Sequence, residues 1–554
     1  MQSHLLFAKA QTPIPYQAKP NNTINLEKKI MDTSFSKIVS SNEMKRLEKE
    51  TFRTGVTSEM LMEKAGISVS RRVAEILGHG TILSLIGPGK NGGDGLIAAT
   101  QLKNLGFRSL GLTISEVAGT KLYENAKKSG VDFYELGNYK DQNLLIDKLL
   151  TESDLILDAI YGIGLNKSIT PPVSSLIESV NRVRENHSDK KIVALDIPSG
   201  LNPDSGIADK STIKADITLS LGLTKLGLCS TNGIIFGGRN EIIDIGVSTI
   251  DSKAFSSIIS KELVSPKLPI RPLSSHKGTF GHTLIIGGST NFTGAVSLAT
   301  IGAQRAGAGL TTMAIPESIY PIVSSHVKEA IYLPLTENPE IGFASNAFTL
   351  IQRNFKNYTS ILIGCGLGLS KNSRELTKNI LLEDQLPEIP LVIDADALNI
   401  LSENPNWHQK IARCSILTPH PGEMARLTGK PIKEIEFDRV NICRSYAIKW
   451  GCIVILKGAF TVIGSPSGNT WISLFANPNL ATAGTGDILA GIISGLMAQK
   501  VEPLDAAISG VYLHGLSAEM ANPEHVSSGI IASDLLPIIP KAMSQITKKE
   551  FRNG

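Results

Sequence analysis

Apolar residues in the first half of the chain occur both at helical spacing and in short continuous runs. From residue 36 onward, the pattern predicts a charged helix starting at 43–50 and a longer amphipathic helix over 57–76. Short, strongly apolar runs predict strands at 81–86, 109–113, 154–160, 191–197, 217–221 and 241–247. Helical segments separate several of these runs, which is typical of βαβ units in a mostly parallel sheet.

A second strand-and-helix series follows. Its predicted strands are 282–286, 309–315, 360–363, 391–393, 415–417 and 452–457, and its longest predicted helices are 486–499 and 504–519. The residues between the two series hold one helical stretch and then three prolines, Pro266, Pro269 and Pro272. Such a segment is typical of a domain boundary.

The pattern therefore predicts an α/β protein with two domains in series. We expect a flexible leader at 1–35, a first domain at 36–252 and a second domain at 262–550. Each domain is expected to own a complete sheet, so that a cut between about 252 and 272 should leave two folded halves.

Composition limits the classes of protein to consider. With 42% hydrophobic and 19% charged residues in a chain of 554, the protein has ordinary globular composition. A net charge of +4 without a basic stripe argues against nucleic acid as a partner. Five cysteines, an odd number without a C-x-x-C pair, predict reduced thiols in a cytoplasmic protein. The histidines lack the spacing of a transition-metal site.

The termini and apolar runs suggest no membrane role. No apolar run approaches the roughly 18 residues that a membrane-spanning helix needs. Residues 1–35 are polar, contain prolines but no arginine, and lack the apolar core of a signal peptide. We interpret them as a flexible leader, with Met31 as an alternative start.

Glycines, acids and amides gather at three predicted strand ends in the first half. Residues 87–95 read GPGKNGGDG between a strand and a helix, where backbone N–H groups and the helix N-terminus favour a phosphate. A tight βα turn would explain the glycines alone, and the acidic residue expected about 20 positions after a dinucleotide fingerprint is not evident. Asp158 and Asp196 end two further strands, where open α/β sheets bind ligands, although either could be a simple cap.

These motifs together resemble the epimerase domain of the NAD(P)H-hydrate repair family over about residues 36–250. The resemblance implies a Rossmann-like parallel-sheet domain that interconverts the R and S hydrates. It also implies a potassium ion held by Asn91, Asp158 and Ser199, with Asp196 as the catalytic acid/base that contacts substrate. The implied substrate-binding residues are Lys90, Asn91, Gly92, Gly93, Asp94, Gly162, Ile163, Gly164, Leu165, Asn166, Lys167 and Ser168.

The second half carries an anion-hole motif. Residues 483–487 read AGTGD and precede a predicted helix, so that successive N–H groups can hold a phosphoryl group while Asp487 removes a proton from an acceptor hydroxyl. The alternative is a glycine-rich turn with Asp487 as a helix cap. Lys457 follows another strand and can hold nucleotide phosphates, and His420 lies in a Pro-bracketed strand-end loop. We expect Cys365 to be a packed small residue rather than a nucleophile.

This second set resembles the ribokinase-like, ADP/ATP-dependent NAD(P)H-hydrate dehydratase over about residues 265–545. The resemblance implies that the hydrate contacts Gly368, His420 and the catalytic Asp487. The nucleotide, ADP or ATP with Mg²⁺, would contact Lys457, Gly458, Ala459, Phe460, Thr461 and Gly486. Phosphorylation of the hydrate's hydroxyl turns a poor leaving group into a good one, so that loss of phosphate restores NADH or NADPH.

Both motif sets on one chain predict a repair enzyme for both epimers, because an epimerase can feed a stereospecific dehydratase. Two alternatives remain at this point. One is a ribokinase-class kinase of a vitamin alcohol with an unrelated N-terminal domain, and the other is a nucleotide-sensing N-terminal module without catalysis. We expect small-molecule partners (NADH hydrate, NADPH hydrate and ADP or ATP), no nucleic acid or membrane, and a homo-oligomer.

Overall fold

The computed structural model describes residues 37–114, 117, 119–137, 142–165, 167–187, 189–247, 256–338, 342–343, 347–383, 388–411, 415–521 and 528–547. The expected leader at 1–35 lies outside these residues. Within the described ranges, every helix is too short or too polar to cross a membrane.

The N-terminal half is built on a sheet of seven described strands, all of which run parallel to their neighbours. In sheet order these are β4 (Asp132–Glu135), β3 (Arg108–Thr113), β2 (Thr81–Ile86), β5 (Leu155–Ala159), β6 (Lys191–Leu195), β7 (Ile217–Leu221) and β9 (Arg239–Ile243). The central strands are buried on both faces, which explains why they appear in the sequence as continuous apolar runs.

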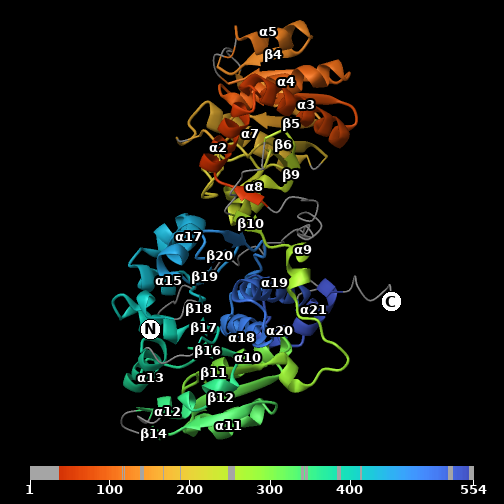
Figure 1. The fold of residues 1–554 in the computed structure, drawn as a ribbon. Helices are drawn as coiled ribbons and strands as arrows, with labels where there is room; N and C mark the ends of the chain where they lie inside the picture. The colour runs from red at the N-terminus through yellow and green to blue at the C-terminus, as the bar shows by residue number, and fades with distance from the viewer. Residues whose placement is uncertain are drawn as a thin grey trace, which may run out of the picture.

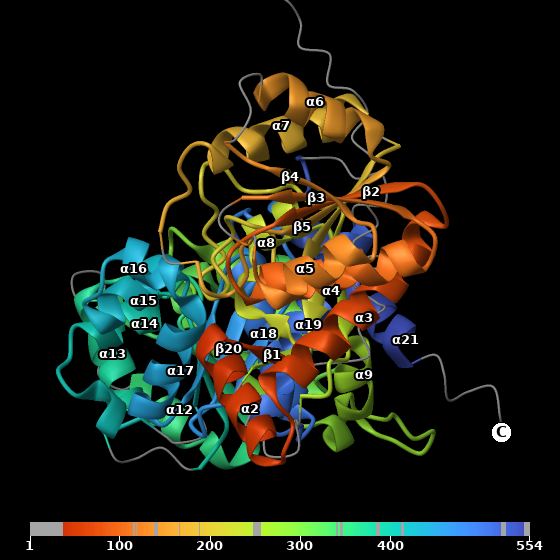
Figure 2. The ribbon, with the colours of Figure 1, turned by 90° about the horizontal axis from the view of Figure 1, so that it is seen from above.

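Helices cover both faces of this sheet, as Figure 2 shows. Apolar side chains of α2, α3 and α4 pack on one face with Leu155 and Val193, while α6 and α7 pack on the other face with Ile156 and Ile192. The helices are α2 (Ser41–Arg53), α3 (Ser58–Leu77), α4 (Lys90–Asn104), α5 (Lys121–Lys128), α6 (Gln142–Glu152), α7 (Val173–Asn186) and α8 (Thr231–Gly237).

The C-terminal half holds a larger, mainly parallel sheet. Its parallel strands, in sheet order, are β13 (Ile331–Leu335), β12 (Leu310–Pro316), β11 (His282–Ile286), β16 (Ser360–Ile363), β17 (Leu391–Ile393), β18 (Ser415–Leu417) and β19 (Ile453–Leu456). The antiparallel β20 (Val462–Gly464) and β21 (Thr470–Ile472) follow at one edge, and β14 (Glu337–Asn338) and β15 (Gly342–Phe343) form a separate pair.

Two groups of helices sandwich this sheet (Figure 1). One face is covered by α9 (Lys261–Val264), α10 (Thr293–Arg305), α11 (Tyr320–His326), α18 (Thr485–Ala498), α19 (Pro503–Ala521), α20 (Ala532–Leu535) and α21 (Ile539–Thr547). The other is covered by α12 (Ala347–Gln352), α13 (Lys371–Leu381), α14 (Asp396–Ser402), α15 (Pro421–Thr428), α16 (Ile432–Phe437) and α17 (Arg439–Trp450). The expected α/β class with parallel sheets is confirmed.

A bridge of three short strands joins the two halves. Strand β10 (Ser256–Ile258) pairs with β21 on one side and with β1 (Lys37–Val39) on the other, and β1 also pairs with β8 (Thr224–Lys225). The C-terminal sheet therefore continues into strands from the N-terminal half, to twelve described strands. A small apolar cluster fills the junction, formed by Ile38, Leu226, Cys229, Ile258, Phe460 and Ile472.

The expected elements compare closely with the observed ones. The strands expected at 81–86, 217–221, 282–286, 360–363, 391–393 and 415–417 have those bounds, and other boundaries differ by a few residues. The bridging strands were not anticipated, because two or three residues carry too little periodicity to identify a strand. The division at 252 and 262 stays a prediction, and the structure adds that β10 lies between those two limits.

Candidate functional site

The N-terminal half contains a cavity of about 870 Å³ at the carboxyl ends of its strands. Segments that follow β2, β5 and β6 line it, and α2 and α3 contribute further side chains. The expected substrate-binding residues on its wall are Lys90, Asn91, Asp94, Gly162, Ile163, Gly164, Leu165, Lys167, Ser168 and Asp196. Gly92 and Gly93 are not part of the wall, and Asn166 lies outside the described residues.

The glycine-rich loop after β2 serves two purposes. A Cβ atom on Gly92 would lie 1.8 Å from the carbonyl oxygen of Gly87, and one on Gly87 would lie 1.9 Å from that of Ile160. These two glycines are therefore required by the turn itself. A Cβ atom on Gly89 would meet nothing within 4 Å, and this residue lines the cavity. The ligand-facing part of the loop is thus near Gly89, at the N-terminus of α4.

The expected potassium ligands are Asp158 and Ser199, which bond to each other, and Asn91, which lies on the cavity wall. The Ser199 hydroxyl donates to Asp158 Oδ1 at 2.6 Å, and the Ser199 N–H donates to Oδ2 at 2.8 Å. Asp158 is fully buried, and burial raises its pKa to about 6 against the effect of these hydrogen bonds. The side-chain amide nitrogen of Asn91 is buried without a hydrogen-bond partner among the described residues. Asn91 also lies beside Gly162, with Oδ1 at 3.4 Å from where a Cβ would be.

Asp196 is held by a lysine that the sequence reasoning missed. The ammonium of Lys225, a fully buried residue of β8, forms an ion pair with Asp196 Oδ1 and donates to the carbonyl of Leu221 at 2.8 Å. The N–H of Leu221 also donates to Asp196 Oδ1 at 3.0 Å. Asp196 has φ +69, a conformation that few residues other than glycine adopt, so the surrounding contacts fix its position.

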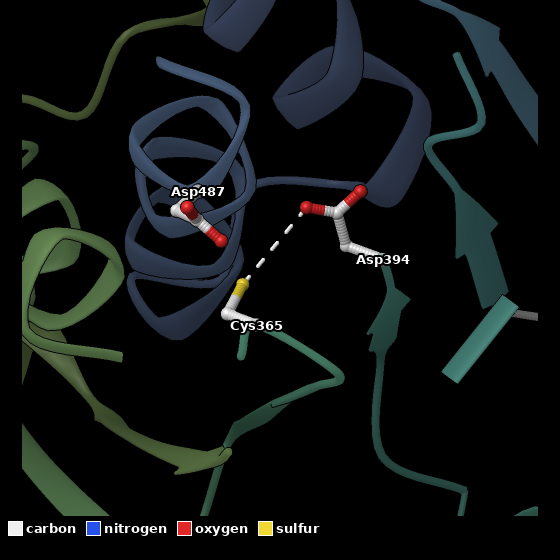
Figure 3. A group of neighbouring side chains, drawn as sticks. All are labelled: Cys365, Asp394 and Asp487. Atoms are coloured by element: carbon white, nitrogen blue, oxygen red, sulfur yellow. Dashed lines mark hydrogen bonds between the residues drawn. The ribbon is translucent and has the colours of Figure 1, made fainter. Parts of the chain in front are cut away.

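The C-terminal candidate site centres on Asp487, in the first turn of α18. Figure 3 shows its carboxylate beside Cys365 and Asp394, and the ligand atoms of the three lie within 4.8 Å of one another. Burial and the charge of Asp394 raise the pKa of Asp487 to about 6. Cys365 is buried, and burial with the two neighbouring carboxylates raises its pKa, so the thiol stays protonated. This supports the expectation that Cys365 packs rather than reacts as a nucleophile.

Lys457 connects this group to a second acid. Its ammonium lies 2.7 Å from Asp394 Oδ1 and 3.9 Å from a carboxylate oxygen of Glu423. Burial alone would lower the pKa of Lys457, but these two carboxylates raise it above its ordinary value. Burial raises the pKa of Glu423 to about 7. A Cβ on Gly486 would lie 3.3 Å from the Lys457 ammonium, so this positive charge lies next to the start of α18.

Gly368, His420 and Phe460 were also expected to contact the hydrate or the nucleotide. The N–H of Gly368 donates to Asp396 at 2.8 Å. His420 caps α15 by accepting from the N–H of Gly422 at 3.0 Å, and burial with the charge of Lys457 lowers its pKa. The Phe460 side chain is buried in the junction between the halves, so only its backbone could meet a nucleotide.

Sequence reasoning missed Lys225 and gave Asp394 and Glu423 no role. Lys225 belongs to none of the motifs identified in the sequence, and only the tertiary structure shows that it is fully buried against Asp196. Asp394 and Glu423 each follow a predicted strand, β17 or β18, and this position was the signal that could have identified them.

Two family models match the chain. One, described as "YjeF-related protein N-terminus", matches residues 58–227, and the other, "NAD(P)H-hydrate dehydratase", matches residues 283–541. Among solved structures, the ADP/ATP-dependent NAD(P)H-hydrate dehydratase of Bacillus subtilis, co-crystallised with ATP/Mg²⁺, is 31% identical, with a TM-score of 0.45. The alignment covers 52% of this chain and 98% of that one.

Two further relatives align with nearly the whole chain. The "Bifunctional NAD(P)H-hydrate repair enzyme Nnr" of Moorella thermoacetica is 34% identical over 526 residues, which is 92% of this chain and 97% of that protein. The protein of the same name from Coxiella burnetii is 31% identical over 90% of this chain and 98% of its own length. The chain therefore belongs to the family of bifunctional NAD(P)H-hydrate repair enzymes.

Proposed function

We propose that the chain repairs hydrated NADH and NADPH in two steps, one in each half. The N-terminal cavity epimerises the R and S hydrates, and the C-terminal site dehydrates the S hydrate with ADP or ATP and releases phosphate. The observation that carries the proposal is that each half holds its own group of acids at strand or helix ends. Relatives named bifunctional NAD(P)H-hydrate repair enzymes align along nearly the full chain, which supports it.

Epimerisation needs a proton to move to and from the hydroxyl of the hydrated ring carbon, and Asp196 is the group that we assign to this transfer. Its carboxylate lines the cavity at the end of β6, while its backbone and Lys225 hold it in one position. The substrate's pyrophosphate would lie over the loop near Gly89 and the N-terminus of α4, where N–H groups favour an anion. Gly162 to Leu165, Lys167 and Ser168 would form the opposite side of the binding site.

The residues around Asp158 fit a potassium ion. A carboxylate, a hydroxyl and the carbonyl oxygen of a side-chain amide are the hard oxygen donors that an alkali cation takes, and the first two already lie 2.6 Å apart. A cation would also offset the cost of ionising Asp158, whose pKa burial raises to about 6. Asn91, Asp158 and Ser199 would hold it, and so fix the loop that binds the pyrophosphate.

In the C-terminal half, Asp487 is the proposed base. A pKa of about 6 leaves it ionised at neutral pH and close to the value that favours proton transfer. It would take the proton of the hydrate's hydroxyl as that oxygen accepts a phosphoryl group. The C–O bond then breaks with phosphate as the leaving group while the ring nitrogen's lone pair forms a C=N bond, and loss of a proton from the adjacent ring carbon to water restores the dihydropyridine. Gly368 and His420 would contact the hydrate.

Lys457 and the start of α18 would hold the nucleotide. The N–H groups around Gly486 form the anion hole, and the adjacent Lys457 ammonium adds a positive charge for phosphate oxygens. Lys457, Gly458, Ala459, Thr461 and the Phe460 backbone would complete this surface. The carboxylate oxygen of Asp394 that faces Cys365 and Asp487 fits Mg²⁺, which supplies charge neutralisation when it is bound with the phosphates.

We further propose a cytoplasmic homo-oligomer with small molecules as partners. The cysteines that the structure describes, Cys229, Cys365, Cys443 and Cys452, are buried free thiols, as suits a reducing compartment. Light scattering of the purified protein tests the oligomer, and a monomer would contradict it.

The deciding experiment is incubation with prepared NADH hydrate, with and without ADP. We expect the absorbance of reduced nicotinamide to return only with nucleotide, one phosphate to be released for each cofactor restored, and R–S exchange to occur without nucleotide. A stable phosphorylated product would instead indicate a small-molecule kinase. Exchange without any recovery would leave only the epimerase half of the proposal.

A further inference from the structure

We propose that Asp94 is a second catalytic proton carrier of the N-terminal site, working opposite Asp196, and that Lys225 positions Asp196 for this exchange. The inference rests on the proposed epimerase function and gives Asp94 a catalytic task beyond the substrate contact that the family resemblance implied. Asp94 lies on α4 and Asp196 at the end of β6, so two independent elements bring their carboxyls to the wall of one cavity.

Asp94 is unsuited to phosphate binding. It is only 7% exposed and lines the cavity, and among the described residues its carboxyl forms no hydrogen bond or ion pair. An ionised carboxylate there would repel a pyrophosphate, whereas a protonated one has a proton free to donate. The nearby Gly89 backbone already offers N–H groups for the phosphate.

The charges around Asp94 favour its protonated form. Burial raises its pKa most, and the charges of Asp196 and Glu48 raise it further. Lys90 and Lys225 oppose this shift, but the net pKa lies well above the ordinary value. Lys90 is itself exposed and paired with Glu48 at 3.4 Å, which weakens its effect on Asp94.

Asp196 has the opposite surroundings. Lys225 and the Leu221 N–H both bond to its Oδ1, an arrangement that stabilises a carboxylate and leaves Oδ2 to meet a ligand. A buried carboxyl without a hydrogen-bond partner in the described structure and a carboxyl paired with an ammonium, on the wall of one cavity, can serve as acid and base. Lys225 also borders the cavity, but its ammonium is bonded to Asp196 and to the Leu221 carbonyl, so we assign it the positioning of Asp196.

The reaction balances with these two groups and water. Asp94 gives its proton to the ring hydroxyl, the C–O bond breaks, and the nitrogen lone pair forms a C=N bond as water departs. Water then adds to the other face, the C=N electrons return to nitrogen, and Asp196 accepts the proton lost by that water. One turnover leaves Asp94 ionised and Asp196 protonated, so a proton returns from Asp196 to Asp94 through water before the next turnover. In the reverse direction the two carboxyls exchange roles.

The test uses the full chain with Asp94→Asn, Asp94→Glu and the control Asp132→Asn, an exposed residue at the start of β4. Asp94→Asn should slow R–S exchange by roughly 10²–10⁴-fold, as for a lost general acid, while Asp94→Glu recovers part of it. Nucleotide-dependent dehydration of the S hydrate, in the other half, should stay unchanged and shows that each variant is folded. Asp94→Asn with exchange within tenfold of wild type would overturn the proposal.

A second measurement does not depend on the folding of Asp94 variants. Because Asp94 must be protonated, exchange in the wild type should fall as pH rises through its pKa. Glu48→Gln removes a negative charge that raises this pKa, so the falling limb should move to lower pH. A limb that stays in place would also overturn the proposal. If the wild-type chain shows no exchange at all, the epimerase assignment fails instead, and the two failures are distinguishable.

Discussion

Asp487→Asn removes the proposed base of the dehydratase with little change in shape. The amide keeps the size of the carboxylate and can remain at the start of α18, beside Cys365 and Asp394. It cannot take a proton at neutral pH. Since the anion hole and Lys457 are unaltered, we expect nucleotide to bind with near wild-type affinity.

The loss of a general base should cost about 10²–10⁴-fold in turnover, or about 3–5 kcal/mol of transition-state stabilisation. The same substitution should stabilise the folded protein at neutral pH. Burial and Asp394 raise the Asp487 pKa from 3.8 to about 6, so keeping this side chain ionised costs at most about 3 kcal/mol.

The sign of the pH effect follows from linkage. A raised pKa means that the folded state binds more protons than the unfolded state between about pH 4 and pH 6. Wild-type stability should therefore fall relative to Asp487→Asn as pH rises through this window, and the difference should be constant above it. Thermal unfolding midpoints of both proteins across about pH 4–8 measure this.

The activity assay follows the return of reduced-nicotinamide absorbance from S hydrate, with R–S exchange measured separately by chromatography. Wild-type dehydration should fall below about pH 6, where Asp487 becomes protonated. Exchange should persist in the variant, because its site lies in the other half. More than about a tenth of wild-type dehydration in Asp487→Asn would reduce Asp487 to a helix cap and refute the assignment.

Three further changes test other parts of the chain. Asp158→Ala should reduce exchange and its dependence on potassium, with dehydration of S hydrate unchanged; equal loss of both activities in folded protein would contradict the assignment. Lys457→Met removes the ammonium that would contact phosphate oxygens and leaves Asp394 without its 2.7 Å ion pair, so nucleotide affinity measured by calorimetry should fall at least tenfold. Unchanged affinity would show that Lys457 does not bind the nucleotide. A protease site placed at 248–255 should give two fragments that co-elute in gel filtration, because β10 pairs with both β1 and β21; fragments that separate would show that the bridge contributes little.

The sequence predicts two halves that fold independently, whereas the structure predicts that the two fragments stay associated after cleavage. Two runs of βαβ units with prolines between them predict two cores, and the structure has a separate apolar core on each sheet. Residues 37–39, 224–225 and 256–258 are too short to be recognised as strands, yet they continue one sheet across the junction. Local patterns cannot reveal such pairing, because β10 pairs with β1 and with β21 through residues more than 200 positions apart.

Candidate site residues divide in the same way. Asp158, Asp196 and Asp487 could be identified because each ends a strand or begins a helix, and position along the chain indicates the ligand-binding edge. The charge state of such a residue depends instead on tertiary neighbours. Lys225 illustrates this, since only its burial against Asp196 distinguishes it from an ordinary surface lysine.

The two sites share an electrostatic arrangement with opposite consequences. In each, a lysine pairs with one carboxylate, the buried Lys225 with Asp196 and the partly buried Lys457 with Asp394, while a second carboxyl nearby has a raised pKa. Burial and Asp394 raise the pKa of Asp487 to about 6, and its proposed role as a base needs the ionised form, so dehydration should be lost in acid. The pKa of Asp94 lies well above its ordinary value and the residue works protonated, so exchange should be lost in base. Repair of both epimers needs both activities. Loss of dehydration as Asp487 becomes protonated therefore sets the lower limit of its pH range, and loss of exchange as Asp94 becomes ionised sets the upper limit.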